Sequence, residues 1–569
     1  MRTATVLLAL LLASCGSSSD DVDAGGGSDA STPPPGTDAG DPSGDGGVPT
    51  GVDAGDGVEV VDVSHDREVR GVWIATVYNI NWPSRSGLSA DAQRAELDAL
   101  LDVAADAGMN SVFMQVRAES DAFYASELEP WSRFLTGTSG GDPGWDPLAH
   151  AIDAAHARGL ELHAWMNPYR ALVSGGPSTA ASSHIVNARP ELVVRYGDLH
   201  WIDPGNPDGR AHTLAVIRDV LERYDIDGLH FDDYFYPYPE SGVAFPDDAS
   251  YAAHGDGLAR DDWRRRNVNE MVAAVHALVR EVAPDVRFGI SPFGIYRPGM
   301  PAGIRGLDQY AALFADPIAW MEAGTVDYIA PQLYWPTTRA AQDYALLLDW
   351  WAAEADATGV DLLVGNYLAQ LGSSSEWPLS EIRTQLELVR ADDRAAGNIQ
   401  YHIDPIVEDR MGAADLLRGH HAVPATTPPI PGATDGPGLP GVTVTGADVA
   451  LAGDGRCFAI YRDEGGAWII DRLVFGDATR LYRGRWAVSL VARNGLESRG
   501  VVIDVEEGDP TDPPVDPPMG AGCDHSFGGR YAHTACSASY QCCDGAWQML
   551  PGGCGACLCV EESGMTGCP

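Results

Sequence analysis

The sequence predicts a (β/α)8 barrel of the α/β class, followed by a small β-sandwich and a cysteine-rich module. Two observations carry the barrel prediction. Eight short apolar segments alternate with amphipathic helical segments between residues 69 and 403, and the first strand–helix turn lacks a glycine-rich fingerprint. That fingerprint would favour a doubly wound open sheet, which also usually has fewer strands. The chain has 569 residues, more than one hydrophobic core usually supports, so further modules are expected.

The predicted strands are short runs rich in β-branched, aromatic and aliphatic residues. The helical segments between them carry apolar residues at helical spacing, as in residues 91–108 and 269–284. Together these units predict a barrel domain over residues 64–424, consistent with a typical barrel of about 250 residues enlarged by insertions. The eight predicted strands are residues 69–76, 111–116, 161–166, 228–231, 287–292, 327–334, 361–367 and 398–403.

The first fifteen residues, "MRTATVLLALLLASC", combine a cationic start, a short apolar run and small residues directly before Cys15. The apolar run is too short to cross a membrane, so the segment predicts a signal peptide. Because the small residues precede a cysteine, it resembles a bacterial lipoprotein signal, with a lipid anchor on Cys15. Plain secretion is the alternative. Gly16 is not an acidic retention signal, which favours the outer membrane of a bacterial cell envelope.

The acidic composition lies largely outside the predicted domains. The formal net charge is -44, and nine Asp but no Lys or Arg occur between residues 16 and 57. Residues 16–63 repeat Asp, Gly and Pro, which predicts a disordered spacer. The chain contains no lysine, and without clustered cations a nucleic-acid partner is disfavoured. We expect a monomer that meets a polysaccharide substrate and, through Cys15, a membrane.

Two smaller modules are predicted after the barrel. A linker at residues 425–440 leads to alternating apolar and polar residues at 441–507, which are typical of a fibronectin type III-like β-sandwich. A second linker, 508–520, precedes residues 521–569, which hold eight of the ten cysteines. A dense, even set of cysteines in an exported segment predicts disulfides, whose connectivity stays open. A zinc module built on "CGACLC" is the weaker alternative.

Polar side chains follow the carboxyl ends of the predicted strands, where such barrels place their catalytic groups. The fourth strand ends in Asp232 and Asp233, the principal catalytic candidates. Several carboxylates among aromatic residues suit a glycosidase, because aromatic faces stack on sugars while paired carboxyls transfer protons. Glu119 and Asp121 are further catalytic candidates. The candidates for substrate binding are Arg117, His163, Asn167, Arg170, His230, Tyr234, Gln332, Tyr334 and Trp335.

Adjacent residues of an extended segment point to opposite sides, so Asp232 and Asp233 are not expected to be the catalytic pair. One would face the mouth, and the other would brace an arginine such as Arg117 or Arg170. The partner carboxyl would then be Glu119, Asp121 or Glu240. Each candidate also has a plain structural alternative. These are an N-cap for the two Asp, a salt bridge or solvated loop for the other acids, a hydrogen-bonded core position for His163 and His230, and packing for Tyr334 and Trp335.

No cofactor is predicted. The sequence has no HxH or HExxH spacing, so a transition-metal centre is not expected, while a structural calcium ion held by loop carboxylates stays open. A deacetylase or esterase would need a metal triad or a Ser/His pair, neither of which the sequence displays.

Six segments in order resemble one known family: "REVRGVWIATVYNINWPS", "MQVRAESDAFYASELEPWSRFLTG", "WDPLAHAIDAAHARGLELHAWMNPYR", "DGLHFDDYFYPYP", "GISPFGIYR" and "DYIAPQLYW". They are similar to the glycosyl hydrolase-like family ten, a group of bacterial barrel proteins often exported as lipoproteins. The resemblance spans residues 68–409. It implies that Asp232 and Asp233 form the acidic motif of the fourth strand and that Arg117 and Asp121 belong to the motif of the second. Ala118 and Glu119 stand where a proline is expected, and residues 398–403 are atypical.

Two hypotheses for function follow. The first is a glycoside hydrolase of the cell envelope that cleaves a polymeric glycan, since the resemblance implies peptidoglycan strands, which contain N-acetylhexosamine, for some relatives. Asp232 would be its principal catalytic carboxylate. The second is a non-catalytic, glycan-binding or scaffolding surface lipoprotein whose accessory modules dock it to a polymer.

Overall fold

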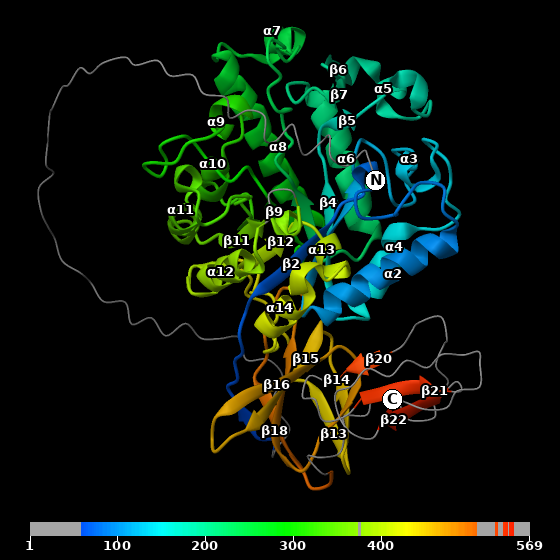
Figure 1. Cartoon of the computed structure of the whole chain (residues 1–569), viewed down its shortest axis with the longest axis vertical. Coiled ribbons are helices and arrows are strands. Elements are labelled where there is room, and N and C mark those ends of the chain that lie inside the picture. Colours follow the sequence, from blue (N-terminus) through cyan, green and yellow to red (C-terminus); the bar gives the residue numbers. More distant parts are fainter. Residues whose placement is uncertain (1–57, 374–376, 509–529, 533–538, 544–545, 551–569) are drawn as a thin grey trace, which may run out of the picture. The chain divides into compact units, whose positions relative to one another are not determined.

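A computed structural model describes residues 58–373, 377–508, 530–532, 539–543 and 546–550. Eight parallel strands close into a barrel in the order β10-β11-β12-β2-β3-β4-β8-β9 (Figure 1). The predicted (β/α)8 barrel is thereby confirmed. Its strands are β2 (Val69–Ile74), β3 (Ser111–Arg117), β4 (Glu161–Met166), β8 (Gly228–Phe231), β9 (Arg287–Ile290), β10 (Tyr328–Ile329), β11 (Asp361–Asn366) and β12 (Ala395–Gln400).

All eight strands coincide with predicted segments, but β10 is much shorter than residues 327–334. Pro331 interrupts it, because proline has no N–H for the ladder. The chain still follows its neighbours beyond that point: Ala330 N donates to Ile290 O and Gly365 N donates to Pro331 O, at 2.8 and 3.0 Å. The irregular stretch keeps Gln332 at the mouth of the barrel.

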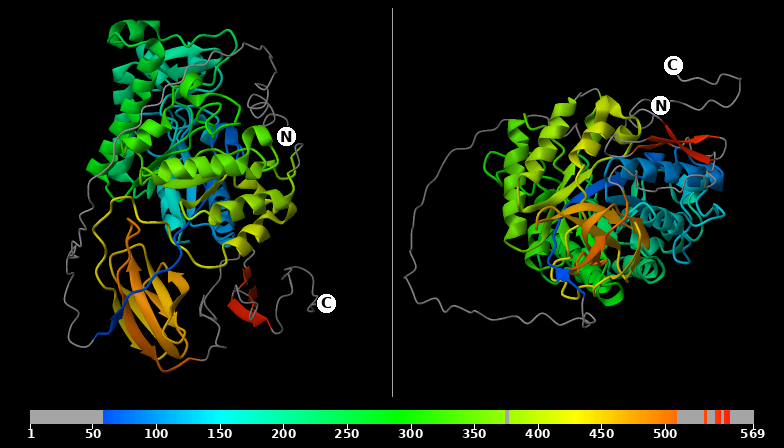
Figure 2. Two further views of the ribbon diagram at one scale, coloured as in Figure 1. Left: turned by 90° about the vertical axis from the view of Figure 1, so that its left-hand side faces the viewer. Right: turned by 90° about the horizontal axis from the view of Figure 1, so that it is seen from below.

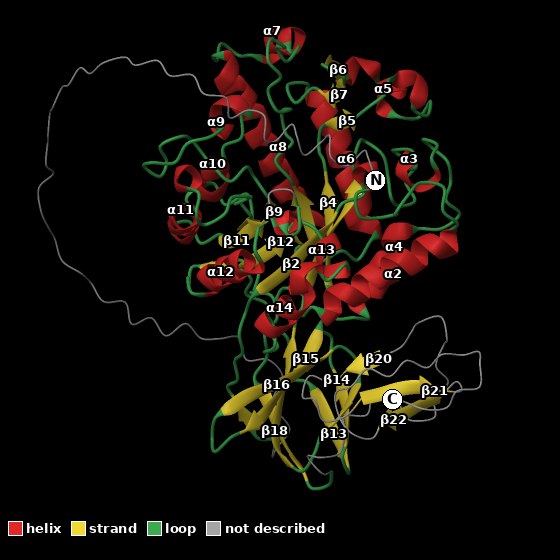
Figure 3. Cartoon of the chain, in the orientation of Figure 1, coloured by secondary structure: helices red, strands yellow, loops and turns green. Residues whose placement is uncertain are grey.

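Helices surround the strands and cover the outer face of the barrel (Figures 2 and 3). Helix α2 shows the principle: Leu97, Leu101 and Ala104 are buried on one face, and the Ser89 hydroxyl caps the first turn by accepting from Ala92 N. The longer helices are α2 (Ala90–Asp106), α4 (Pro147–His156), α6 (Pro207–Arg223), α8 (Arg260–Val282), α11 (Tyr344–Asp356), α12 (Leu379–Arg390) and α14 (Ala413–His420). The shorter ones are α3 (Arg133–Thr136), α5 (Ile185–Ala188), α7 (Asp248–His254), α9 (Gln309–Ala312), α10 (Pro317–Glu322) and α13 (Asp404–Val407).

The barrel interior is packed with aromatic side chains, and glycines make room for them. A Cβ on Gly228 would lie 2.1 Å from His163 Nδ1, and one on Gly289 would lie 2.3 Å from the Tyr328 ring. Large rings therefore cross the barrel at these two positions. The interior cluster comprises Val69, Trp73, Ala75, Phe113, Trp165, Tyr328, Ala330, Leu363 and Ile399.

An insertion that the sequence did not predict follows β4. It forms a three-stranded antiparallel sheet in the order β5-β7-β6, from β5 (Arg170–Leu172), β6 (Val193–Tyr196) and β7 (Leu199–Ile202). Because it leaves the carboxyl end of β4, this sheet borders the mouth. Trp201 ties the insertion to the loop after β8, since its indole N–H donates to Phe235 O at 2.8 Å.

The segment after the barrel folds as two antiparallel sheets, β13-β14-β17 and β1-β19-β18-β15-β16. These two sheets agree with the predicted β-sandwich, while its likeness to fibronectin type III stays a prediction. The strands are β13 (Gly441–Thr445), β14 (Asp448–Ala452), β15 (Cys457–Asp463), β16 (Trp468–Val474), β17 (Ala478–Arg480), β18 (Gly484–Val491) and β19 (Gly500–Val505). Strand β1 (Val60–Val61) pairs with β19, which corrects the prediction that residues up to 63 are linker. These valines gain a sheet partner that local composition does not reveal.

Near the carboxyl terminus, β20 (Arg530–Ala532), β21 (Ser539–Cys543) and β22 (Ala546–Leu550) form an antiparallel sheet. Cys15 lies outside the described residues. So do the side chains of the eight late cysteines, and the predicted lipidation and disulfides therefore stay predictions. Among the described helices, none is long and apolar enough to cross a membrane.

Candidate active site

Asp232 is the first residue after β8 and turns inward over the barrel. His230, two residues earlier, lies inside the barrel, whereas Phe231 packs outward against Phe288. Period-two alternation therefore brings Asp232 to the inner side, where it is 5% exposed. Its Oδ2 accepts from Asn167 Nδ2 at 2.6 Å and Trp165 Nε1 at 3.1 Å, and its Oδ1 accepts from Tyr234 N at 3.0 Å.

A relay of amides fixes the orientation of the Asn167 side chain. Gln115 Oε1 accepts from the backbone N–H groups of Thr76 and Val77, so its Nε2 must face the other way and donates to Asn167 Oδ1 at 2.8 Å. Arg170 donates to the same oxygen at 2.7 Å. With its oxygen held by two donors, Asn167 can only present its N–H to Asp232.

Asp232 and Asp233 form a coupled pair in which Asp232 carries the negative charge. Burial raises the pKa of Asp232, but the Arg170 charge and the three N–H donors favour its ionised form. Burial and the adjacent Asp232 charge together raise the pKa of Asp233 to about 7. Tyr238 donates its hydroxyl to Asp233 Oδ2. Asp233 therefore keeps a proton close to neutral pH while Asp232 is an anion.

The structure corrects three expectations for this pair. Because β8 ends at Phe231 and the chain turns so that Tyr234 N donates to Asp232 Oδ1, strand alternation does not extend to Asp233 and does not separate the two side chains. Neither Asp caps a helix, because a loop follows them, and Asp232 instead forms a local turn with Tyr234 N. Neither braces an arginine through a hydrogen bond in the part of the chain that is described. Arg117 pairs with Glu129, and Arg170 donates to Ala118 O and Asn167. Because these partners occupy the guanidinium groups, Asp232 and Asp233 accept hydrogen bonds only from neutral donors among the described residues.

The other predicted acids lie elsewhere on the rim. Glu119 accepts from Arg133 Nε at 2.5 Å and Val173 N at 3.0 Å, and burial followed by the Asp121 charge raises its pKa to about 7. Asp121 Oδ1 accepts from the backbone N–H groups of Ala118 and Glu119. Glu240 is exposed. No hydrogen bond joins these three acids to the Asp pair among the described residues, and the contacts of Glu119 match the salt-bridge alternative.

Tyrosines line the mouth of the barrel near the Asp pair. Tyr334 stacks on Tyr367 with ring centroids 4.6 Å apart, and Tyr401 lies 5.7 Å from Tyr334. Tyr334 follows β10 and Tyr401 follows β12, so both rings stand at the carboxyl ends of barrel strands, as the Asp pair does. Arg170 covers the ring of Tyr234 at 5.1 Å. Of the remaining candidates, Gln332 donates to Ser291 O at 2.9 Å, and Trp335 packs edge-on against Phe293.

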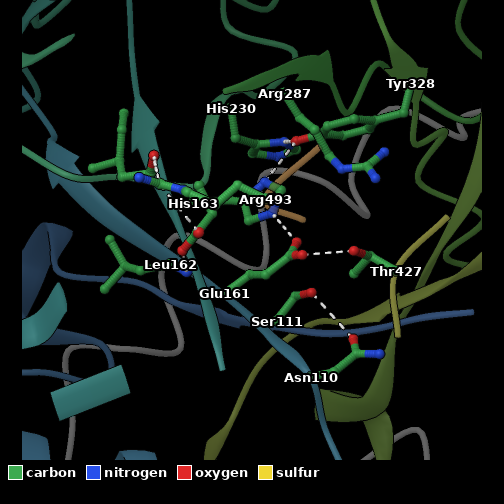
Figure 4. A network of polar contacts seen from close by, with 12 residues as sticks. Asn110, Ser111, Glu161, Leu162, His163, His230, Arg287, Tyr328, Thr427 and Arg493 are labelled. Carbon is green, nitrogen blue, oxygen red and sulfur yellow. Dashed lines mark hydrogen bonds and ion pairs between the residues drawn. The ribbon is translucent and has the colours of Figure 1, made fainter. Parts of the chain in front are cut away.

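His163 and His230 lie inside the barrel rather than at its mouth (Figure 4). Trp73 Nε1 donates to His230 Nε2 at 3.2 Å, so the proton of His230 is on Nδ1 and faces Tyr328 OH at 3.0 Å. Tyr328 OH lies 3.4 Å from His163 Nδ1, and His163 Nε2 lies 3.2 Å from Glu161. The structure thus does not bring His163 to the Asp pair, and its contacts match the alternative of a hydrogen-bonded core residue.

This geometry agrees with comparisons to known proteins. A family model described as "Glycosyl hydrolase-like 10" matches residues 68–378. The chain belongs to the glycosyl hydrolase-like 10 family. Glycosyl hydrolase YngK of Bacillus subtilis is 39% identical over 384 residues, covering 65% of this chain and 75% of that protein. Glycosyl hydrolase DigH of Escherichia coli K12 is 34% identical over 365 residues, covering 59% of this chain and 83% of that one.

Among solved structures, the glycoside hydrolase domain of PgaB (BpsB) from Bordetella bronchiseptica aligns with a TM-score of 0.44 and 13% identity. The alignment covers 62% of this chain and 98% of that domain. The family assignment confirms the resemblance drawn from the six sequence segments. As a member of the glycosyl hydrolase-like 10 family, the chain is a hydrolase-like protein that acts on glycans.

Four further residues contribute to the mouth of this glycosyl hydrolase-like 10 barrel, and two of them, Tyr238 and Tyr401, were not singled out from the sequence. Trp165 and Gln115 position Asp232, and Tyr238 and Tyr401 border the pair. Gln115 and Trp165 stand at the carboxyl ends of the second and third predicted strands, and that position is the sequence signal that points to them. Among the described residues, no group of three or more His, Cys, Asp or Glu is placed to hold a metal ion.

Proposed function

We propose that the protein is a glycoside hydrolase that cleaves O-glycosidic bonds in a polymeric glycan. The observation that carries this proposal is the unequal Asp pair at the mouth: Asp232 is held as an anion by three N–H donors, while Asp233 keeps a proton with a pKa of about 7. Glycoside hydrolysis needs one protonated and one ionised carboxyl near the anomeric carbon.

The two carboxyls then take different roles. Asp233 donates its proton to the leaving oxygen of the glycosidic bond, since its pKa near neutrality makes it an effective general acid. Asp232 stabilises the positive charge that develops on the sugar ring in the oxocarbenium-like transition state. A water molecule then forms the new bond to the anomeric carbon and gives its proton to the ionised Asp233, which restores the acid. The relay through Gln115 and Asn167 holds Asp232 before substrate arrives, so little reorganisation is needed during the reaction.

The substrate we propose is peptidoglycan glycan strands, which contain N-acetylhexosamine. Tyr334 and Tyr401, which are partly exposed, offer aromatic surface to sugar rings, and Tyr367 is stacked on Tyr334. These uncharged tyrosines, which we call the tyrosine wall, suit a neutral carbohydrate. The signal-like segment ending at Cys15 and the spacer after it support a lipid-anchored location in the cell envelope, at the outer membrane. This location would bring a soluble barrel to an insoluble polymer.

The alternative function is glycan binding without catalysis, in which the mouth serves only as a carbohydrate site. Tyrosine platforms are compatible with both functions. A binding site has no need, however, to bury two adjacent carboxyls without a cation, which costs free energy. The Asp pair therefore favours the hydrolase.

The deciding experiment is product analysis by mass spectrometry. Full-length protein in detergent is incubated with peptidoglycan, peptide-free glycan strands and N-acetylglucosamine oligomers, beside Asp232→Asn and Asp233→Asn. Asp285→Asn, at an exposed position, is the matched control. Sugar fragments released by the wild type and the control, and absent from both mouth variants, would establish the hydrolase. Co-sedimentation with a polymer without any released fragment would establish the binding protein instead.

A further inference from the structure

A second polar group lies on the rim of the mouth, beside the Asp pair but separate from it. It consists of Asn81, in the loop after β2, and of His402 and Asp404, which follow β12. Strands β2 and β12 are neighbours in the barrel, so their carboxyl ends bring these residues together. Asn81 Nδ2 donates to His402 Nδ1 at 2.9 Å and to Asp404 Oδ1 at 2.8 Å. We call these three residues the rim triad.

The hydrogen bonds of the rim triad determine which atoms are left for a ligand. Asn81 Oδ1 accepts from Ala75 N at 2.7 Å, so the amide nitrogen must face His402 and Asp404. Asp404 N also points at His402 Nδ1, at 3.3 Å. Because both neighbours of Nδ1 are donors, this nitrogen is an acceptor, and the ring proton is on Nε2. Burial lowers the pKa of His402 to about 4, which keeps the ring neutral.

Two atoms of the rim triad make no hydrogen bond to the described part of the chain: the Nε2–H of His402 and Oδ2 of Asp404, whose contact with His402 Nδ1 at 3.6 Å involves a nitrogen without a proton. Neither atom is enclosed, and the side chains are 14% and 29% exposed. The triad therefore presents one neutral donor and one anionic acceptor next to each other. The nearby charges of Glu408 and Arg410 pair with one another.

Tyr401 connects the rim triad to the Asp pair. Its ring meets His402 edge-on at 5.2 Å and lies 5.9 Å from Tyr367 in the tyrosine wall. The charges of Asp232 and Asp233 act on the same Tyr401 ring. A sugar chain that passes the Asp pair along this wall would reach the rim triad with a neighbouring unit.

We propose that Asn81, His402 and Asp404 form a sugar subsite that binds adjacent hydroxyl or amide groups of an uncharged unit of the glycan. His402 Nε2–H donates to one oxygen of that unit, and Asp404 Oδ2 accepts from a neighbouring O–H or N–H. The charge on Asp404 disfavours a unit that carries a carboxylate, so in peptidoglycan strands the subsite takes the N-acetylglucosamine unit. This inference rests on the proposed function, because it assumes that the mouth binds a glycan.

The test is the kinetics of Asp404→Asn in the full-length protein on peptide-free glycan strands. The substitution keeps the shape of the side chain and replaces the anionic acceptor with a donor. We expect KM to rise about tenfold or more while kcat changes by less than about threefold, because a charged hydrogen bond to a bound sugar is lost. Glu408→Gln, four residues away and exposed, is the control and leaves both constants unchanged. Unchanged KM in Asp404→Asn, with the wild type active, would overturn the subsite.

A second variant shows whether the effect belongs to the subsite and not to one misfolded protein, and a binding assay gives a result even if the protein is inactive. His402→Phe removes the donor but keeps a ring against Tyr401, and it should raise KM in the same way. Its melting temperature should fall by a few degrees while the variant stays folded, because Nδ1 no longer accepts from Asn81 Nδ2 and Asp404 N. Calorimetric binding of N-acetylglucosamine hexamers is measured for every variant. If the wild type releases no fragments, the hydrolase proposal fails, yet weaker hexamer binding by both variants would still support the subsite. Equal binding by wild type and variants, or no binding by any, would overturn it.

Discussion

Two ends of the same barrel bury acidic side chains in opposite ways. At the amino ends of the strands, Asp227 accepts from Arg456 at 2.7 Å, His156 at 2.7 Å and Leu162 N at 2.8 Å, and Glu161 accepts from Thr427 at 2.6 Å. At the carboxyl ends, Asp232 and Asp233 are buried to a similar extent. The described residues offer this second pair neutral donors but no cation in hydrogen-bond contact.

The difference appears in the pKa values. Burial raises the pKa of Glu161, but the Arg456 charge and the His163 hydrogen bond outweigh burial and bring this pKa to about 2. Arg456 and His156 likewise hold the pKa of Asp227 well below its usual range, against the effect of burial. Burial and mutual repulsion instead raise the pKa of Asp233 to about 7. A compensated carboxylate stabilises the fold, whereas an uncompensated one costs stability and has a proton to exchange near neutral pH. Burial alone therefore does not mark a functional acid; the lack of a cation in hydrogen-bond contact does.

The largest effect is expected from Asp232→Asn. The variant retains the shape of the side chain but loses the negative charge that the transition state needs, so kcat on glycan strands should fall at least about 10³-fold. Its melting temperature should change little, since the fold does not depend on this charge. Steady-state kinetics and calorimetry check both statements. Retained activity would mean that the charge of the mouth pair has no catalytic role.

Removing the cation at the opposite end should produce the reverse pattern. Arg456→Met removes the guanidinium that Asp227 and Glu161 share and leaves Asp227 only the more distant Arg493, at 3.4 Å. Breaking a buried ion pair typically costs about 3–5 kcal/mol of unfolding free energy. We expect kcat of the folded variant to stay at the wild-type value. Arg462→Met, which breaks an exposed pair with Glu464, is the control and should cost less than about 1 kcal/mol. Urea unfolding measures the stability loss of both variants. A loss of kcat in folded Arg456→Met would show that the ion pair at the amino ends of the strands also serves catalysis, which would contradict the comparison.

The sequence predicted the eight barrel strands because strands buried on both faces are continuous apolar runs. It missed the sheet β5-β7-β6 because those strands are short and partly exposed. Asp232 and Asp233 were predicted from their position after a strand. Their unequal charge was not, because it depends on Gln115, Asn167 and Trp165, which lie on other strands. The contact of Asn167 with Asp232 joins residues 65 positions apart, and spacing along one chain does not encode it.

The two ends should also respond to pH with opposite signs. Asp233 binds its proton more tightly in the folded protein, with a pKa of about 7 against an ordinary value of 3.8, so its contribution to stability is largest at low pH and is lost as the pH rises toward 7. Glu119, with a pKa of about 7, acts in the same direction. Glu161, with a pKa of about 2 against 4.5, contributes stability above pH 4.5 that is lost as the pH falls toward 2.

Unfolding free energies measured from pH 3 to 8 separate these contributions. Asp233→Asn should flatten the decline between pH 4 and 7, with Glu119 accounting for what remains of it. Glu161→Gln should instead flatten the rise between pH 3 and 4.5. If both substitutions altered the same part of the pH profile of stability, the acids at the two ends of the barrel would not have opposite pH dependences, and the comparison would be refuted.

The smallest effect is expected from Trp165→Phe, which tests whether neutral donors suffice to keep Asp232 ionised. The variant loses one of the three N–H groups on that carboxylate, so the pKa of Asp232 should rise and kcat should fall about tenfold, as for one hydrogen bond to a charged group. The acidic limb of the pH–rate profile should move to higher pH. Trp82→Phe, which removes a buried indole donor to Gln93 O, is the matched control. It should lower stability by a similar amount and leave the acidic limb in place, because its carbonyl partner does not titrate. An unmoved limb in Trp165→Phe would assign the charge of Asp232 to Arg170 instead of to the donors that touch it.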